Sequence, residues 1–403
     1  MPRINRQVPS VSLSTKPLAQ SPPLQHLTYQ ELDILHTLRG FCAFYVVIFH
    51  AKFILWSGGR QYLQVHPRTT WGILDYLAFG ADMLSSAGYE MVIFFFVLSG
   101  FFIRYAQLRK HRKPIAFYKN RIVRIYPPFL FASVLAAVGV WCIAQGVPAA
   151  LATDNGRELN ATLAQAWQEL RTLGVGGVAR TLGFMQVGNV YIGYNDVYWS
   201  LLPEAIFYLV VPLAFWRIWA YYGVSVVLHV VGLLWTQHGP LNPFTDYLLT
   251  FNFYFAVGAM FYDVVVRTPW LTWTRRVPGW VLYVLLAGLF GGLLLLAVLK
   301  LKPLSGLVSA LLAILSMSTL LAGKVSGQNL LMRLLHTTGV FSFSLYLYHF
   351  PLLLLCYSAL VLLTGETVFY ARYYWLALPL VTGVAYMLYW LTERVSVAYF
   401  RKV

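Results

Sequence analysis

The sequence predicts an all-α protein, a polytopic membrane helix bundle of about ten transmembrane helices with both termini in the cytoplasm. The 403 residues are 59% hydrophobic and only 11% charged, which is more apolar surface than a soluble domain can bury. The apolar residues gather in runs of about 20, the length that a helix needs to cross a bilayer. Residues 104–124, RYAQLRKHRKPIAFYKNRIVR, carry eight Lys and Arg and no acid, as is typical of a cytoplasmic loop.

The chain divides into a short tail and one membrane domain. Residues 1–30 are rich in Ser, Pro and Gln and predict a disordered cytoplasmic tail, whereas residues 31–403 form a single integral-membrane domain. In chain order, the expected spans are 34–56, 88–107, 125–147, 200–218, 220–236, 247–266, 278–299, 304–323, 338–362 and 374–396. The division of residues 200–236 rests only on Arg217 and a cluster of Trp and Tyr.

Charge follows the expected topology. With alternating spans, 21 of the 30 Lys and Arg fall on the inner side, so membrane orientation accounts for most of the net charge of +16. Binding of nucleic acid is therefore not needed to explain the basic balance. Two long loops, 57–87 and 148–199, fall on the outer side, and the second contains an amphipathic stretch suited to the membrane surface.

The first span holds two ionisable residues in the segment LRGFCAFYVVIFH, residues 38–50. Arg39 and His50 are eleven residues apart, so they project from nearly the same helix face about 16 Å apart along the axis. Ionisable groups inside a membrane are costly and usually face the bundle interior. The alternative is a structural pair, with Arg39 reaching lipid phosphate and His50 bonding a neighbouring helix.

Five motifs in order make the chain resemble the acyltransferase-3 family of membrane acyltransferases. They are LRGFCAFYVVIFH at 38–50, FFFVLSGFFI at 94–103, RIVRIYPPF at 121–129, WSLLPEAIFYLVVP at 199–212 and GVFSFSLYLYHFP at 339–351, with a weaker YWLTER at 389–394. Each motif is a modest pattern, but their joint order over most of the chain is specific. The chain departs from the family pattern at His36, where members usually have Asp, although Asp33 lies one turn earlier.

The resemblance implies an O-acyltransferase of the bacterial cytoplasmic membrane. It would move an acyl group, with acetyl expected, from cytoplasmic acyl-CoA to a hydroxyl of an extracytoplasmic carbohydrate or lipid-linked sugar. The resemblance assigns catalysis to His50 with Arg39 as its partner, and no metal. It also singles out the cytoplasmic arginines Arg121 and Arg124, and further highlights Ser99, Gly100 and Glu204.

The chemistry can also be built from the residues alone. A hydroxyl that attacks a thioester needs a base, and neutral histidine suits this role near pH 7. Glu204 lies about one turn into a span that runs inward, so we expect it near the depth of His50, where its carboxylate would orient the imidazole. Ser200, Glu204 and Tyr208 share a helix face. The alternative for Glu204 is an outer-interface carboxylate without a catalytic part.

The donor site is expected at the cytoplasmic side. Arg121 and Arg124 share a helix face and match phosphate oxygens, so they would hold the nucleotide of acyl-CoA while its pantetheine arm reaches up the bundle past Arg39. Arg39 and His50 would thus line one conduit.

Three further residues leave two interpretations open. Ser99 and Gly100 line this conduit or pack helices. His349 lines the donor path or braces the bundle. The rival function for the whole chain is a transporter or flippase of a lipid-linked saccharide, although no internal repeat supports it.

Overall fold

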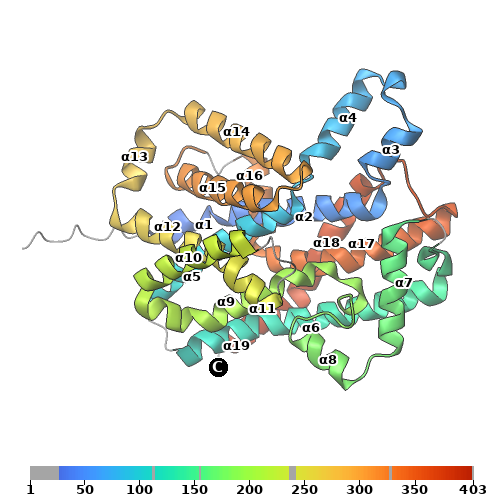
Figure 1. Cartoon of the computed structure of the whole chain (residues 1–403), viewed down its shortest axis with the longest axis horizontal. Helices are drawn as coiled ribbons and strands as arrows, with labels where there is room; N and C mark the ends of the chain where they lie inside the picture. The colour runs from blue at the N-terminus through green and yellow to red at the C-terminus, as the bar shows by residue number, and fades with distance from the viewer. Residues whose placement is uncertain (1–26, 111–113, 154–155, 236–241, 326–328, 402–403) are drawn as a thin grey trace, which may run out of the picture.

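The computed structural model describes residues 27–110, 114–153, 156–235, 242–325 and 329–401 (Figure 1). Within these residues the chain is helical without a β-strand, and nine helical segments are long and apolar enough to cross a membrane. The all-α membrane bundle is therefore confirmed. Most of the tail predicted over residues 1–30 lies outside the described residues, as do Arg112 and Lys113 of the basic loop.

The helices follow one another along the chain with few long connections. They are α1 Tyr29–Asp33, α2 His36–Leu55, α3 Gly59–Val65, η1 Arg68–Thr70, α4 Ile73–Leu84, α5 Gly88–Lys110, α6 Pro114–Gly146, η2 Pro148–Leu151, α7 Glu158–Arg171, α8 Val175–Leu182, η3 Ile192–Tyr194, η4 Asp196–Ser200, α9 Leu201–Ala214, η5 Phe215–Arg217, α10 Ile218–Trp235, α11 Pro243–Asp246, η7 Tyr247–Phe251, α12 Asn252–Arg267, α13 Trp270–Arg276, α14 Gly279–Val298, α15 Lys302–Leu321, α16 Leu330–Val340, α17 Ser342–Thr364, α18 Tyr374–Leu391 and α19 Glu393–Arg401.

Helix α2 lies at the centre of the bundle, where it contacts α5, α16, α17 and α18 (Figure 1). Two glycines allow its closest approach. A Cβ on Gly40 would lie 1.8 Å from the Leu335 carbonyl oxygen of α16, and one on Gly339 would lie 1.9 Å from the His36 carbonyl oxygen. Because only glycine lets two helix backbones come this close, these positions fix the place of α2 against α16.

Helices α5 and α12 pack in the same way. A Cβ on Gly100 would lie 2.0 Å from the Phe255 carbonyl oxygen, and one on Gly258 would lie 1.9 Å from the Val97 carbonyl oxygen. Gly100 is buried against the backbone of α12. Of the two interpretations of Gly100, the structure therefore supports helix packing rather than a channel wall.

A buried ion pair joins the same two helices. The Arg104 guanidinium contacts the Asp263 carboxylate through Nε at 3.1 Å and through a terminal nitrogen at 3.0 Å. The Tyr222 hydroxyl also donates to Asp263 at 2.7 Å. Because both charges are removed from solvent, each needs the other. Arg104 is the first of the eight basic residues of 104–124, and the end of the bundle that carries this segment is its basic end.

Residues 196–235 are helical from end to end and count as one of the nine apolar segments, although the sequence predicts two spans here. Its first part, α9, runs in the same direction as α12. Midway along α9, the Phe207 ring stacks on Phe255 with centroids 4.2 Å apart. Just after its end, Phe215 is close to Asp263, since the Arg104 guanidinium contacts both side chains.

Its second part, α10, runs in the opposite direction. Near its start Tyr222 bonds to Asp263, and near its end Gly232 packs on Leu249, whose carbonyl oxygen would lie 2.6 Å from a Cβ on that glycine. The segment therefore turns back at η5, close to Arg217. This agrees with the predicted division, and ten crossings in total remain a prediction.

The last two predicted spans are each interrupted near one end. Residues 338–362 begin in the short α16 and continue in α17 after a break at Phe341, and residues 374–396 divide at Thr392 between α18 and α19. By contrast, α6 continues through Pro127 and Pro128 as one helix of 33 residues. Arg121 and Arg124 therefore lie inside a long helix rather than in a loop.

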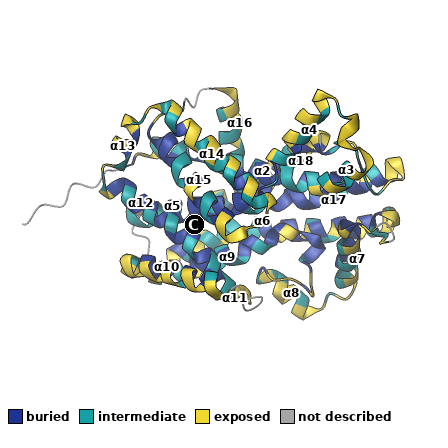
Figure 2. Cartoon of the chain, turned by 45° about the horizontal axis from the view of Figure 1, so that its top comes forward, coloured by how far each residue is buried: buried dark blue, intermediate teal, exposed yellow. Residues whose placement is uncertain are grey.

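The outer surface of the bundle is apolar. In Figure 2 the sides that face inward are buried, whereas the sides of α10 and α14 that face outward are largely exposed. Only Leu282 and Leu293 of α14 are buried, and its exposed residues include Val284 and Leu285. Side chains of this kind on the outside of a helix bundle suit contact with lipid.

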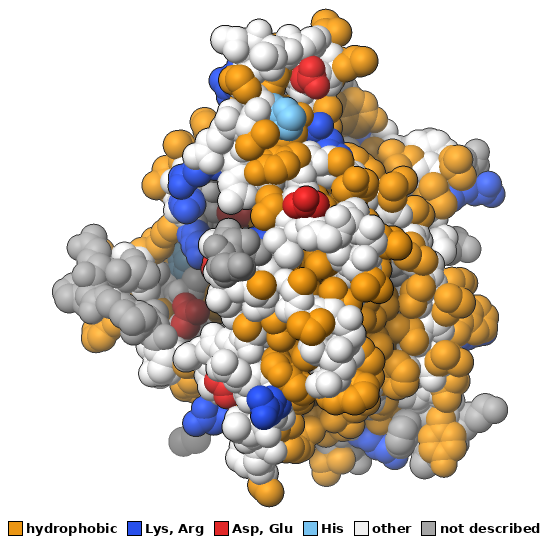
Figure 3. Space-filling model, turned by 90° about the vertical axis from the view of Figure 1, so that its right-hand side faces the viewer, with side chains coloured by type: hydrophobic (Ala, Val, Ile, Leu, Met, Phe, Trp, Pro, Cys, Tyr) orange, Lys and Arg blue, Asp and Glu red, His pale blue; other side chains and the backbone are white. Residues whose placement is uncertain are grey.

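The end of the bundle away from the basic end carries the short elements of the two long loops. Helices α3 and α4 form an arm, and α7 and α8 lie on the other side of the same end (Figure 1). Seen from that end, charged side chains are scattered mainly over the left half, and hydrophobic side chains cover much of the right flank (Figure 3). The amphipathic stretch predicted in residues 148–199 corresponds to α7 and α8.

Candidate active site

Two histidines from different helices meet inside the bundle. His50 of α2 and His349 of α17 approach with His50 Nδ1 and His349 Nε2 2.9 Å apart, and their rings stack with centroids separated by 5.1 Å. His349 is fully buried, whereas His50 is half-buried. The fully buried His349 ring therefore holds a ring that keeps some exposure to solvent.

The hydrogen bonds determine which ring nitrogens carry protons. His349 Nδ1 lies 2.9 Å from the Leu345 carbonyl oxygen, which can only accept, so this nitrogen is the donor. Nε2 of a neutral His349 is then an acceptor, and His50 Nδ1 must donate to it. His50 Nε2 is left with a free lone pair, the form that a general base needs.

The rings beside His50 are aromatic. Phe350 approaches His50 edge-on at 5.2 Å, and Tyr194 lies edge-on against Phe350 at 5.3 Å. Tyr194 has a φ of 53° and follows Gly193 with a φ of 60°, so the backbone here is left-handed at two consecutive residues. The backbone of a residue with a side chain is strained in this conformation, which persists because the surrounding packing holds it. No pattern in the sequence singles out Tyr194.

Arg157 secures the end of the helix that carries His50. Its guanidinium donates to the carbonyl oxygens of Phe53 and Ile54 at 3.2 and 2.7 Å, and to that of Thr367 at 2.7 Å. Phe53 and Ile54 belong to the last turn of α2, whose carbonyl groups have no hydrogen-bond donors within the helix. The Arg157 guanidinium supplies these donors, and its positive charge is favourable at the negative end of the helix dipole. From the sequence, Arg157 was only a basic residue in an outer loop.

The arginines at the other half of the bundle also come together. Arg39 of α2 lies within electrostatic range of Arg124, Glu393 and Glu204. Arg124 Nε is 3.9 Å from a Glu393 carboxylate oxygen. The Arg121 guanidinium lies over the Tyr208 ring, 5.1 Å from its centroid. Three arginines from α2 and α6 thus gather in this half of the bundle.

Glu204 belongs to this basic cluster rather than to the histidine pair. It accepts from the Tyr208 hydroxyl one turn along α9 and from Ser99 at 3.4 Å. Glu204 and Tyr208 thus share a helix face, as predicted, whereas Ser200 lies in η4 and bonds to Tyr346 of α17. The prediction that Glu204 orients the His50 imidazole is wrong, because His349 occupies that place. The error lies in depth, since Glu204 is closer to Arg39 than a simple count from the span boundary indicates.

The helix face between Arg39 and His50 is closed by packing. Ala43 and Val46 share this face and are 0% and 1% exposed. One turn of α17 before His349, the Tyr346 hydroxyl lies 2.7 Å from that of Ser200. The conduit predicted between Arg39 and His50 is therefore filled by side chains in this conformation.

Comparison with known proteins identifies the family. A family model described as an acyltransferase domain, acyltransferase-3, matches residues 32–390. The chain belongs to the acyltransferase-3 family. Neither the curated proteins nor the solved structures contain a match to it. Membership and the apolar helices together make the chain an integral-membrane acyltransferase.

The departure of this acyltransferase from the usual family pattern has a visible consequence. His36, at the position of the usual Asp, stacks on Phe102 and meets the His336 ring edge-on at 5.8 Å. His336 Nε2 is in turn 2.9 Å from an Asp33 carboxylate oxygen. The carboxylate one turn earlier is thus paired with α16 and not with an arginine.

Among the residues that the structure describes, no group of three or more His, Cys, Asp and Glu is suited to a metal ion. The side chains gathered in the acyltransferase are instead a histidine pair in one half and an arginine cluster in the other. The first can move a proton and the second can bind an anion.

Proposed function

We propose that this acyltransferase takes an acyl group from cytoplasmic acyl-CoA and transfers it to a hydroxyl of an extracytoplasmic carbohydrate or lipid-linked sugar. Acetyl-CoA is the first donor to test. The protein would lie in a bacterial cytoplasmic membrane with both termini in the cytoplasm. The observation that carries the proposal is the hydrogen bond between His50 and His349, which leaves a basic nitrogen on the half-buried ring.

His50 acts as the general base in this proposal. Its Nε2 takes the proton of the acceptor hydroxyl while the hydroxyl oxygen attacks the thioester carbonyl carbon. The carbon–oxygen bond forms, the carbon–sulfur bond breaks, and the proton passes from His50 to the departing thiolate to give CoA. His349 accepts from His50 Nδ1 throughout, so it stabilises the positive charge on the His50 ring and holds its orientation.

The arginine cluster is the proposed donor site. Arg121, Arg124 and Arg39 would bind the phosphates of the CoA nucleotide, because guanidinium groups match phosphate oxygens in pairs. His50 lies about 16 Å along the same helix from Arg39, a distance that the pantetheine arm must cover. Because Ala43 and Val46 are buried, the arm would displace side chains along this face as it enters.

Glu204 keeps a proposed part in catalysis through the arginine cluster. Its carboxylate, held by Tyr208 and Ser99, would orient Arg39 rather than the histidine. The rival function, transport of a lipid-linked saccharide, has no observation of the structure in its favour, and the family match favours the enzyme.

The test is acyl transfer by the purified protein in liposomes. Labelled acetyl-CoA is added to one side with an acceptor glycan on the other, and release of CoA and label on the glycan are measured. We expect His50→Ala to abolish both signals, whereas His66→Ala, at an exposed histidine of the outer arm, leaves them intact. Transfer by the His50→Ala protein at the wild-type rate would contradict the proposal, and saccharide movement without CoA release would favour the transporter.

A further inference from the structure

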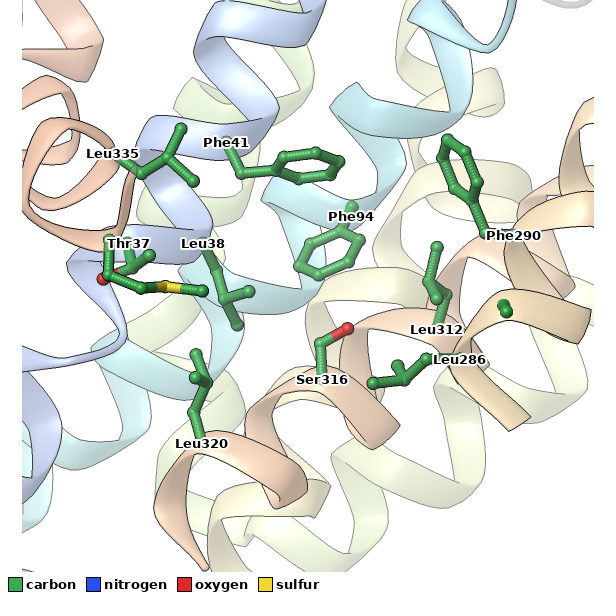
Figure 4. Close-up of a pocket in the computed structure, with 12 residues that line it drawn as sticks. Thr37, Leu38, Phe41, Phe94, Leu286, Phe290, Leu312, Ser316, Leu320 and Leu335 are labelled. Atoms are coloured by element: carbon green, nitrogen blue, oxygen red, sulfur yellow. The ribbon is translucent and has the colours of Figure 1, made fainter. Parts of the chain in front are cut away.

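A cavity of about 340 Å³ lies between α2, α5, α14, α15 and α16, and the described residues that line it include no member of the histidine pair or of the arginine cluster. Figure 4 shows Phe41, Phe94, Phe290 and Leu312 around it, and among the described residues of its lining only Thr37 and Ser316 carry a hydroxyl group. The cavity is open rather than enclosed. Because α14 buries so few of its residues, this opening faces the surroundings of the bundle.

A second cavity of about 280 Å³ adjoins the first at Leu320, which lines both. Its walls include Arg275 at the end of α13 and Glu31 at the start of the chain's first helices. The Lys324 ammonium donates to the Arg275 carbonyl oxygen at 2.9 Å, and Arg276 follows directly in the chain. Arg275 and Glu31 are thus the charged residues of the cavity wall, and two further cations, Arg276 and Lys324, lie next to Arg275.

The depth of the second cavity is marked by aromatic side chains. Trp273 precedes Arg275 on α13, and Trp280 and Tyr283 begin α14, all three of them exposed. Exposed Trp and Tyr gather where a membrane protein meets the lipid head groups. The cations therefore lie at head-group level, while the first cavity lies at the level of the acyl chains.

We propose that the two adjoining cavities bind one anionic phospholipid. Its phosphate lies against Arg275, with Arg276 and Lys324 adding to the attraction, and one acyl chain enters the apolar cavity between α14 and α2. Within a membrane, lipid tails surround every apolar surface alike, so the tail adds little selectivity. Selection must come from the head group, and clustered basic residues at the membrane surface supply it. This proposal does not depend on the proposed function.

The test is native mass spectrometry of the whole protein, released from detergent and titrated with two lipids that share their acyl chains. One is the anionic phosphatidylglycerol and the other the zwitterionic phosphatidylcholine. We expect the anionic lipid to bind at least about tenfold more tightly. Substitution of Arg275→Gln with Arg276→Gln removes this preference, while Arg217→Gln, a basic residue on another helix, retains it. Equal binding of the two lipids by the wild type overturns the proposal.

A second pair of variants tests the acyl-chain cavity. Ser316→Phe places a ring in the cavity and is expected to weaken binding of both lipids, because their shared acyl chain then has less room. Leu311→Phe, exposed on the same helix, is expected to have no effect. Thermal unfolding confirms that each variant folds. Unchanged binding by Ser316→Phe, displacement of the lipid by long-chain acyl-CoA, or a dimer that covers the cavity would each overturn the proposal.

Discussion

The hydrogen bond between His349 and His50 is the contact in the site whose removal is most informative. His349→Ala deletes the acceptor for His50 Nδ1, whereas His349→Gln retains one, because the glutamine carbonyl oxygen can reach close to the position of the imidazole Nε2. His349 lies in the core with 0% exposure, so its replacement changes the interior and leaves the surface unaltered.

The size of the effect follows from the contact. In the transition state the His50 ring carries positive charge, and a hydrogen bond to a charged group contributes about 1.5–3 kcal/mol. Loss of that amount from the transition state lowers kcat about 10- to 150-fold. The KM for the donor should change little, because the arginine cluster that we assign to the donor is made by other residues.

The assay is steady-state acyl transfer in liposomes, with CoA release followed at varied donor concentration. We expect kcat to fall in His349→Ala and to recover in part in His349→Gln, with both proteins unfolding at similar temperatures. Three results would refute the reasoning. These are an unchanged kcat in His349→Ala, a loss confined to the donor KM, and equal losses in the alanine and glutamine proteins.

The remaining predictions concern the donor site, the helix end and the packing. Arg124→Gln should raise the KM for acyl-CoA about 10- to 150-fold, because a charged contact to phosphate is lost. Lys119→Gln, at an exposed residue of the same helix, should leave this KM unchanged. Equal effects of the two substitutions would mean that Arg124 only sets the orientation of the chain in the membrane and does not bind the donor. Arg157→Ala should lower the free energy of unfolding by about 1–3 kcal/mol for each carbonyl left without a donor, and should change kcat more than KM. Arg157→Lys should restore part of both the stability and kcat. An unaltered kcat in Arg157→Ala would show that the contacts of Arg157 to the end of α2 do not support catalysis. Gly100→Ala should lower the free energy of unfolding by about 1–3 kcal/mol, since its Cβ meets the α12 backbone. Gly288→Ala, where no atom lies near the added Cβ, should not lower it. Equal melting curves of the two variants would contradict the close packing of α5 against α12.

The class of the protein and much of its helix layout could be predicted from the order of its residues. Its apolar runs predict the spans because a lipid environment leaves the backbone no option but a helix. The loop basicity and the ordered motifs indicated the family and the residues His50, Arg39, Arg121 and Arg124. Helical periodicity also placed Glu204 and Tyr208 on one face, since that relation is local.

Only the tertiary structure decided which helices supply the partners. His349 lies 299 residues from His50, and Arg157 more than a hundred from the carbonyls that it binds. Nothing in the local sequence encodes such a pairing, because it depends on how α2, α7 and α17 are rotated and shifted in depth. The same lack of depth information led to the wrong partner for Glu204. An error of one turn moves a side chain about 5.4 Å along a helix, which is enough to exchange a histidine for an arginine as its neighbour.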